Sequence, residues 1–384
     1  MTRSLEDKAM GSLAGAAVGD ALGGATEGWS SGAIRTRYGG WVTDLVAGYE
    51  ADLPKTERYS RYHKGDGRIT DDTIMTHALV EVYAAQQRHL DAYDIADHLV
   101  PILMKGRRWI PDMDSDDIPL QRLFLAEKWL VARLYHGHID PREGGTGNMV
   151  NCGAAMYMAP VGIANAADPA RAYAEAIDMT GAHQSSYGRE AAGVMAAAVA
   201  AAMTPDASVD SVVDACLGLA RDGTRAAISA VVDRVRSLPT PDSGWDDILP
   251  PMRQAMAPFD TLGPAYRDPG LGARRASRIH AIEELPIAIG MLVLARGDYR
   301  TAVLGATNYG RDADSIAAMA GAVTGALGGL AAIPAEWRET VARESRMDLE
   351  APGRQMADVA RSIRAADAAA ELARQTAFAT FDPA

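Results

Sequence analysis

Apolar residues recur at helical spacing along most of this chain, and almost no stretch alternates apolar and polar positions as a half-buried strand does. The alanine-rich segments favour helix as well. The pattern predicts an all-α protein with helices near residues 5–24, 71–87, 91–104, 119–135, 150–165, 168–180, 187–203, 208–220, 223–236, 246–257, 278–295, 298–307, 315–330 and 355–375. Residues 28–69, 106–118 and 258–277 lack the pattern and are expected to be loops. Since long loops within a compact domain are usually functional, the first of them is of particular interest.

Two of these helices carry a face without bulky side chains. Glycine recurs every fourth residue at Gly11, Gly15, Gly19 and Gly23, although each glycine costs a helix roughly 1 kcal/mol relative to alanine. The helix predicted at 315–330 has Gly321, Gly325, Gly328 and Gly329. Two such faces can pack with their backbones close together. This packing would bring Asp20 and Glu27 near the start of the second helix; alternatively, the glycines fit one tight crossing and have no functional meaning.

Acidic residues stand at two predicted helix starts. In GRITDDTIMTHALVEV (67–82), Asp71 and Asp72 precede an apolar stripe at helical spacing, so both carboxylates should point toward the interior. Alternatively, they only favour the helix dipole in a first turn that Thr70 caps. Asp312, Asp314 and Ser315 begin a helix that is apolar on every side and must be central.

Burying four carboxylates is costly unless positive charge compensates them. The adjacent Arg68 and Arg311 would leave the group half paired. Hard divalent cations, held by carboxylate and hydroxyl oxygens, would compensate the whole group. Because the chain has no cysteine and histidine cluster at zinc spacing, the sequence predicts Mg²⁺ or Mn²⁺.

Composition excludes several other classes of protein. The chain of 384 residues has a net charge of -12 and no basic run, which argues against a nucleic acid or an anionic membrane as its main partner. Its two cysteines, Cys152 and Cys216, form no disulfide framework, and the N-terminus does not resemble a signal peptide, so we expect a cytoplasmic protein. Residues 315–334 are long enough to span a bilayer, but their alanine and glycine content and acidic front favour a buried helix.

Five stretches together resemble a known family: GDALGGATE (19–27), TDDT (70–73), CGAAMYMAPVG (152–162), TGAHQ (180–184) and GRDADSIAAMAGAVTGALGGLAAIPAEW (310–337). In this order they resemble the ADP-ribosylglycohydrolases, of the dinitrogenase reductase-activating glycohydrolase type. The resemblance implies a single all-α domain over residues 1–384, with motifs across 10–340 and a C-terminal helical extension at 341–384. That extension would be peripheral or an oligomer contact.

The resemblance also implies a binuclear magnesium site and roles for particular residues. The implied metal ligands are Thr70, Asp71, Asp72, Asp312, Asp314 and Ser315. Glu27 matches a glutamate on the substrate side and, with Asp314, is a candidate general base. Asp20 would have a structural role or support the metal ligands.

Two departures from the family pattern concern the substrate. Residues 258–277 match no pattern of the family, and a loop of this kind would select the substrate; the other departure lies in residues 152–157. Many relatives read NGAAMR where this chain has Cys152 and Tyr157 in place of asparagine and arginine, so the usual binding of a diphosphate is in doubt. Gly153 could still hold a phosphate through backbone N–H groups. His183 and Tyr157 could bind phosphate, ribose or a base, or they could be ordinary packed residues. Cys152 is expected to be a small buried residue that fills space in the core.

Several functions therefore stay open. The first is a Mg-dependent hydrolase that releases ADP-ribose from a modified side chain, such as arginine. The second cleaves a smaller ribosyl or nucleoside-type metabolite, and the third is a non-catalytic ADP-ribose-binding or structural relative. A terpenoid synthase is disfavoured, since its motif requires an acid where this chain has Met75.

Overall fold

A computed structural model describes residues 3–54, 56–58, 61–149, 151–241, 244–260 and 281–381. The described residues are all-α apart from one small hairpin. The α-helices are α1 (Leu5–Gly24), α2 (Ser31–Tyr38), α3 (Asp71–Gln86), α4 (Ala92–Asp94), α5 (Val100–Lys105), α6 (Pro119–Arg122), α7 (Leu125–Val131), α8 (Ala159–Ala164), α9 (Pro169–Thr180), α10 (Ser186–Ala202), α11 (Val209–Leu219), α12 (Asp222–Val235), α13 (Leu249–Met256), α14 (Ala281–Leu294), α15 (Tyr299–Tyr309), α16 (Ala313–Gly328), α17 (Ala335–Ser345) and α18 (Ala351–Phe378). The other elements are the π-helices η1 (Ile95–Leu99) and η3 (Ala132–His136), the 3-10 helices η2 (Pro111–Met113), η4 (Pro141–Glu143) and η7 (Leu330–Ala332), and the antiparallel strands β1 (Arg108–Ile110) and β2 (Ser115–Asp117).

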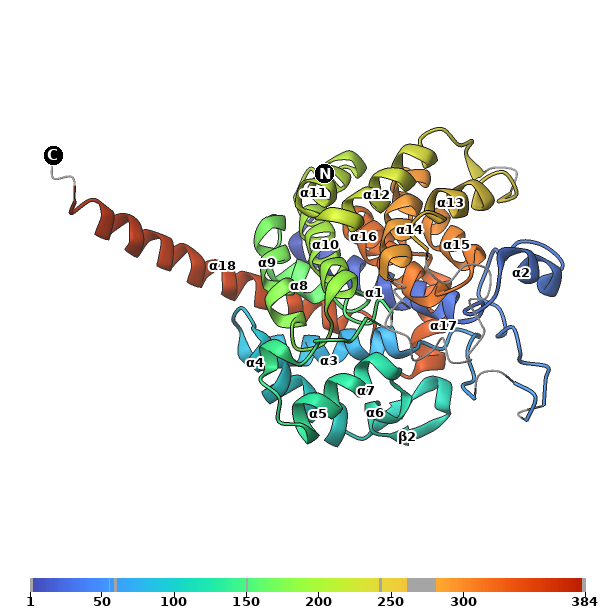
Figure 1. The fold of residues 1–384 in the computed structure, drawn as a ribbon, viewed down its shortest axis with the longest axis horizontal. Coiled ribbons are helices and arrows are strands. Elements are labelled where there is room, and N and C mark those ends of the chain that lie inside the picture. Colours follow the sequence, from blue (N-terminus) through green and yellow to red (C-terminus); the bar gives the residue numbers. More distant parts are fainter. Residues whose placement is uncertain are drawn as a thin grey trace.

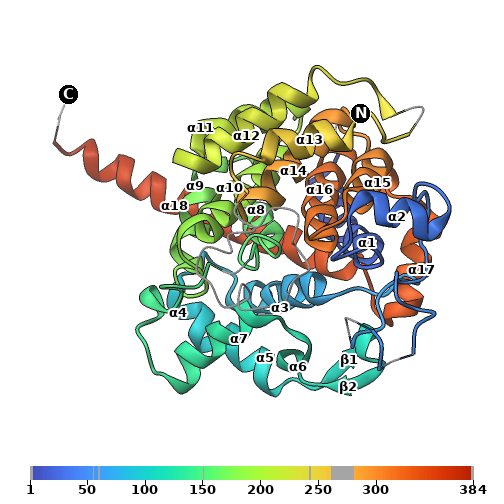
Figure 2. The same ribbon diagram turned by 45° about the vertical axis from the view of Figure 1, so that its right-hand side comes forward.

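The two glycine-bearing helices, α1 and α16, form the centre of the molecule and lie side by side (Figure 2). A Cβ added at Gly15 or Gly19 would overlap the backbone of Gly321 or Ala317 across the contact. Every residue of α16 from Ala313 to Ala326 is buried. The predicted close packing of two backbones is therefore confirmed, and it places the end of α1 beside the start of α16.

The remaining helices surround this pair. Helices α3 to α7 and the hairpin lie on one side of the body, and α10 to α14 lie on the other (Figures 1 and 2). Helices α10, α14 and α15 pack directly on α16. Within the described ranges, we find no helix with the length and hydropathy that crossing a membrane requires.

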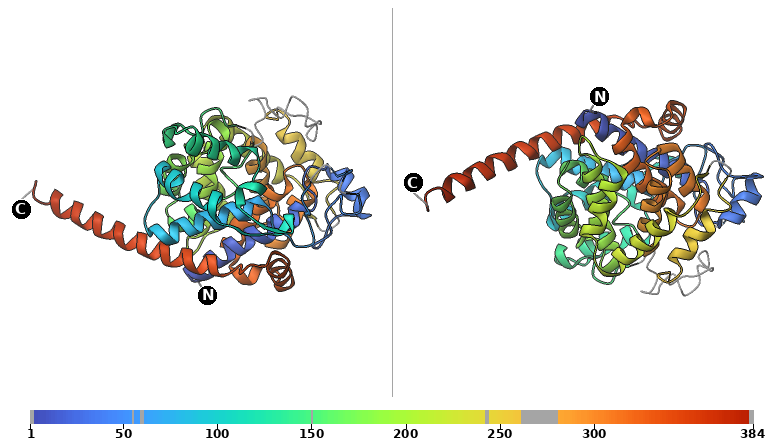
Figure 3. Two further views of the ribbon diagram at one scale, coloured as in Figure 1. Left: turned by 90° about the horizontal axis from the view of Figure 1, so that it is seen from below. Right: turned by 90° about the horizontal axis from the view of Figure 1, so that it is seen from above.

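The C-terminal helix α18 is peripheral only in its second half. Its first half packs on α1, α3 and α8, whereas its second half extends away from the body in every view (Figures 1 and 3). Leu372 and Phe378 on the extended half are each 65% exposed. Whether α18 contacts a second copy of the chain stays a prediction, as does the single domain over residues 1–384.

Some predicted boundaries are wrong. Of the helix expected at 150–165 only α8 is present, because side chains rather than a helix satisfy the backbone before it: Asn151 Oδ1 accepts from Gly153 N, and Gln184 Oε1 accepts from Ala154 N. Two helices were missed, α17 and α2, the second of which lies within a predicted loop. The hairpin lies within another predicted loop, and residues 261–280, which include most of the third, lie outside the described residues.

Candidate metal centre and active site

A carboxylate from α1 holds the start of α3. The fully buried Asp20 accepts hydrogen bonds from the backbone N–H of Thr70 (2.9 Å) and of Thr73 (3.1 Å), and from the Thr73 hydroxyl. Thr70 is the N-cap residue by position, but its side chain makes no capping bond. Its Oγ1 lies 3.4 Å from Oδ2 of Asp72 and from Oδ2 of Asp314. Asp20 therefore takes the capping role expected of Thr70, and the Thr70 hydroxyl faces the carboxylates.

Carboxylates from three separate segments meet at this point. One oxygen each of Asp20, Asp72 and Asp314 lie within 4.8 Å of one another, and so do oxygens of Glu27, Asp312 and Asp314. These side chains come from α1 and the turn after it, from the start of α3 and from the start of α16. The prediction that acids from distant segments converge inside a helical body is thus confirmed. We refer to these five residues with Asp71 as the acid cluster.

Burial makes the charged forms of the cluster costly. Burial raises the pKa of Asp72 and of Asp312 well above the ordinary value and is the largest cause of both shifts. Repulsion from the neighbouring carboxylate of Asp314 is the second largest cause. The same two causes raise the pKa of Asp20 to about 7. The Oδ1 atom of Asp72 is buried and has no hydrogen-bond partner among the described residues. Carboxylate oxygens without a donor, beside a threonine hydroxyl, fit a hard divalent cation.

Arg122 on α6 provides one positive charge to the cluster. Its Nη1 lies 2.8 Å from Oδ1 of Asp71, and its Nε donates to Oδ2 of Asp112 at 2.5 Å. Asp71 is 7% exposed, and burial raises its pKa although Arg122 acts in the opposite direction. The guanidinium is 3% exposed and lies 4.2 Å from the centre of the Tyr62 ring. It is therefore a fixed part of the site.

Lys64 provides the second positive charge, through ion pairs with Glu27 and Asp314. The arginines that the sequence suggested pair elsewhere. Arg311 bonds Glu283, and Arg68 is near Asp66 and Asp114. Sequence reasoning missed Lys64, although it stands only a few residues before Thr70, and it missed Arg122, which lies far from the acids in the chain. No periodicity marks either residue.

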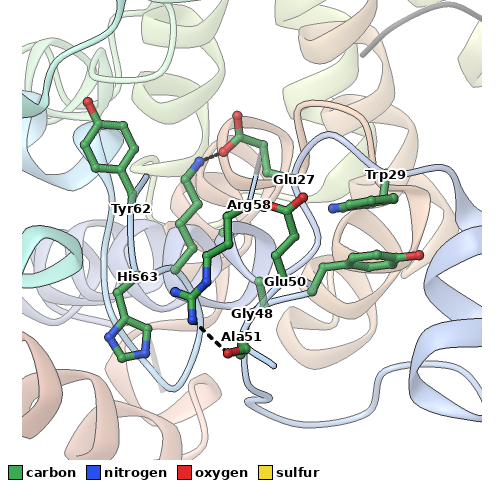
Figure 4. Close-up of a pocket in the computed structure, with 12 residues that line it drawn as sticks. Glu27, Trp29, Gly48, Glu50, Ala51, Arg58, Tyr62 and His63 are labelled. Carbon is green, nitrogen blue, oxygen red and sulfur yellow. Dashed lines mark hydrogen bonds and ion pairs between the residues drawn. The ribbon is translucent and has the colours of Figure 1, made fainter. Parts of the chain in front are cut away.

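Glu27 connects the acid cluster to a pocket (Figure 4). Its side chain is 31% exposed, so it is the open end of an otherwise buried group. Trp29 and Tyr49 stack beside it with ring centroids 3.4 Å apart. The pocket is lined by Gly24, Ala25, Glu27, Trp29, Gly48, Tyr49, Glu50, Ala51, Arg58, Tyr62, His63 and Lys64. Most of these residues belong to the long segment 28–69, which the sequence indicated as functional.

Tyr157 and His183 form a buried pair, with the Tyr157 hydroxyl 3.0 Å from Nδ1 of His183. Neither side chain is exposed, and His183 Nε2 lies 3.5 Å from the buried Glu127. This arrangement favours the packing alternative for both. The N–H of Gly153 already donates to Asn151 Oδ1 (3.0 Å), and a Cβ there would overlap Glu127. Contact of Gly153, Tyr157 or His183 with substrate stays a prediction.

A further group of potential ligands borders the cluster. Cys152 Sγ and carboxylate oxygens of Glu284 and Asp312 lie within 4.8 Å of one another. Cys152 is buried, as expected, but its thiol lies 3.5 Å from Asp312 Oδ2 rather than among apolar groups alone. Glu284 was missed, although an acid within the apolar run of α14 is the same signal that identified Asp71. Ser315 is buried directly after Asp314, where the family resemblance places a ligand.

The fold and site define an all-α protein with a buried carboxylate cluster that suits divalent cations. This chain belongs to the ADP-ribosylglycohydrolase family, whose model matches residues 1–375. It is therefore a member of a family of hydrolases that act on ADP-ribosyl glycosidic bonds.

The similar proteins include curated relatives and solved structures. Uncharacterized protein YegU of Escherichia coli is 24% identical over 329 residues, which cover 85% of this chain and 89% of that protein. ADP-ribosylarginine hydrolase Tri1 of Pseudomonas putida is 26% identical over 339 residues, which cover 88% of this chain and 74% of that protein. A solved structure, described as an ADP-ribosylglycohydrolase-related protein complex, has the same fold, with a TM-score of 0.60 and 20% identity. The match covers 93% of this chain and 97% of that chain.

Proposed function

We propose that this protein hydrolyses the bond between C1 of ADP-ribose and a modified arginine side chain, with Mg²⁺ as its cofactor. The observation that carries the proposal is the meeting of the acids of α3 and α16 beside Glu27, the partly exposed end of the cluster. The similarity to a relative named ADP-ribosylarginine hydrolase supports arginine as the leaving group.

Thr70, Asp71, Asp72, Asp312, Asp314 and Ser315 would hold two ions. When bound, magnesium supplies Lewis acidity and a template for oxygen ligands. Asp20 keeps the first turn of α3 in place through its bonds to Thr70 and Thr73. Arg122 fixes one oxygen of Asp71, which leaves the other free to act as a ligand.

Glu27 is the best placed general base. A carboxylate that binds a metal is a weak base, whereas Glu27 lies at the edge of the cluster and borders the pocket. It would accept a proton from the water that attacks C1. The bond from C1 to the guanidino nitrogen then breaks, and its electron pair and a proton pass to the leaving arginine. Asp314 is the alternative base.

The second candidate is a smaller ribosyl or nucleoside-type substrate. The observation that favours it is the burial of Tyr157 where many relatives have arginine, because this removes a positive charge from the turn expected to bind a phosphate.

One experiment separates the two. The purified protein is incubated with an ADP-ribosylarginine peptide and, separately, with plain nucleosides, each with Mg²⁺ and with EDTA, and the products are quantified by chromatography. We expect ADP-ribose release only with the peptide and Mg²⁺. Base release from nucleosides, with the peptide left intact, would contradict the first proposal and favour the second.

A further inference from the structure

Lys64 reaches the acid cluster from the segment just before α3, and its partners Glu27 and Asp314 both lie far from it in the chain. Its Nζ is paired with Glu27 and lies 3.6 Å from Oδ2 of Asp314, and its side chain is 15% exposed. Both partners belong to the group of Glu27, Asp312 and Asp314, whose ligand atoms lie within 4.8 Å of one another. An ammonium group therefore contacts Asp314, a proposed metal ligand, and Glu27, the proposed base beside it.

The backbone on both sides of Lys64 is anchored. The N–H of His63 donates to the carbonyl of Asp112 (2.6 Å), and the N–H of Asp66 donates to the carbonyl of Val46 (2.8 Å). Lys64 thus begins from a fixed position, and its flexible four-carbon stem alone decides whether the ammonium contacts the cluster.

The two cations that pair with the cluster differ in their freedom to move. Arg122 is shared between Asp71 and Asp112 and is almost fully buried. Lys64 is the more exposed of the two and lines the pocket beside Glu27. When a divalent cation approaches the same carboxylates, the resulting repulsion can displace Lys64 at lower cost than Arg122.

We infer that Lys64 is an internal counter-cation: it pairs with Glu27 and Asp314 in the metal-free protein, withdraws when a divalent ion binds, and so sets the cation affinity of the site. This inference rests on the proposed metal site. The withdrawal of Lys64 also frees the Glu27 carboxylate to accept a proton. Pairing with Lys64 thereby keeps the base inactive until the metal is bound.

The test compares Mn²⁺ binding by metal-free wild type and Lys64→Met, measured by calorimetry after dialysis against EDTA. Methionine keeps the length of the side chain without its charge. We expect Lys64→Met to bind Mn²⁺ at least about tenfold more tightly. The matched control is Lys128→Met, which removes a nearby exposed charge that forms no ion pair with the cluster among the described residues, and should change the affinity by less than about twofold. Unchanged or weaker Mn²⁺ binding by Lys64→Met overturns the inference.

A second measurement uses the wild type, so it does not depend on the folding of a variant. Acetylation of Lys64 by an N-hydroxysuccinimide ester, followed by mass spectrometry, should become faster when Mn²⁺ is added, relative to Lys128. A constant or lower rate overturns the inference. Suppose that Mn²⁺ binds and the arginine peptide is hydrolysed, but Lys64→Met leaves the Mn²⁺ affinity unchanged and Mn²⁺ leaves the acetylation rate of Lys64 unchanged. The inference then fails and the proposed function stands. If no Mn²⁺ binds, the inference and the proposed metal site fail together.

Discussion

The contact between α1 and α16 leaves no room for a side chain at Gly19. A Cβ there would overlap the carbonyl oxygen of Ala317, and would lie 2.6 Å from its carbonyl carbon and 3.1 Å from Ala318 N. These are backbone atoms within the buried part of α16, so a rotamer change cannot relieve the overlap. Gly19→Ala must therefore push two central helices apart.

The expected cost follows from two opposing effects. Alanine favours a helix over glycine by about 1 kcal/mol. Overpacking a well-packed core costs about 1–3 kcal/mol, and a rigid backbone places this case at the upper end. A gap of 0.5–1 Å between the helices would also forfeit roughly a quarter to a half of the dispersion energy of each contact. We expect the free energy of unfolding to fall by about 2 kcal/mol.

Chemical denaturation of the metal-free protein measures this change. The matched control is Gly32→Ala on α2, where an added Cβ meets nothing within 4 Å, and which should be neutral or slightly stabilising. If Gly19→Ala were as stable as Gly32→Ala, the close approach of α1 and α16 would not be what requires glycine, and our explanation of the pattern would be refuted.

Three further predictions concern single residues. Asp20→Ala removes the cap of α3 and should lower the free energy of unfolding by about 2 kcal/mol in the same assay; an unchanged value would contradict the capping role. Asp314→Asn should reduce release of ADP-ribose at least about a hundredfold while circular dichroism stays unchanged, and near-normal activity would contradict its role. The pKa of His89 is raised, mainly by its hydrogen bond to Glu175 and also by its hydrogen bond to Asp367 on α18. Protonated His89 therefore stabilises the fold. This stabilisation is complete below pH 6.5 and is lost as the pH rises through the raised pKa. After correction for the intrinsic pH dependence of amide exchange, the protection of α18 against hydrogen exchange should fall across that range in the wild type and not in His89→Gln; an equal fall in both would contradict this.

The sequence predicted the centre of the molecule well because that part depends on local patterns. Spaced glycines and an apolar run without charges leave few ways to pack α1 and α16, and acids at the start of a buried helix must face inward. The positions of Asp72 and Asp312 follow from this reasoning. The turn at 151–157 could not be predicted in the same way, because its backbone groups are satisfied by Gln184, which lies far along the chain.

Long-range compensation of charge was also beyond sequence reasoning. Arg68 and Arg311 are adjacent to the acids in sequence, yet the structure places Arg122 and Lys64 against them. Which cation pairs with a carboxylate depends on how segments without periodicity fold back on the core. A single sequence carries little information on this point, and the expected roles of Tyr157 and His183 depended on the same missing information.

Crystals soaked in MnCl₂ and measured for anomalous scattering test the central claim most directly. Our account predicts two anomalous peaks within ligand distance of carboxylates from both helix starts, with Asp72 on one side and Asp314 on the other. Peaks that lie elsewhere, or that contact acids of only one helix start, would contradict it.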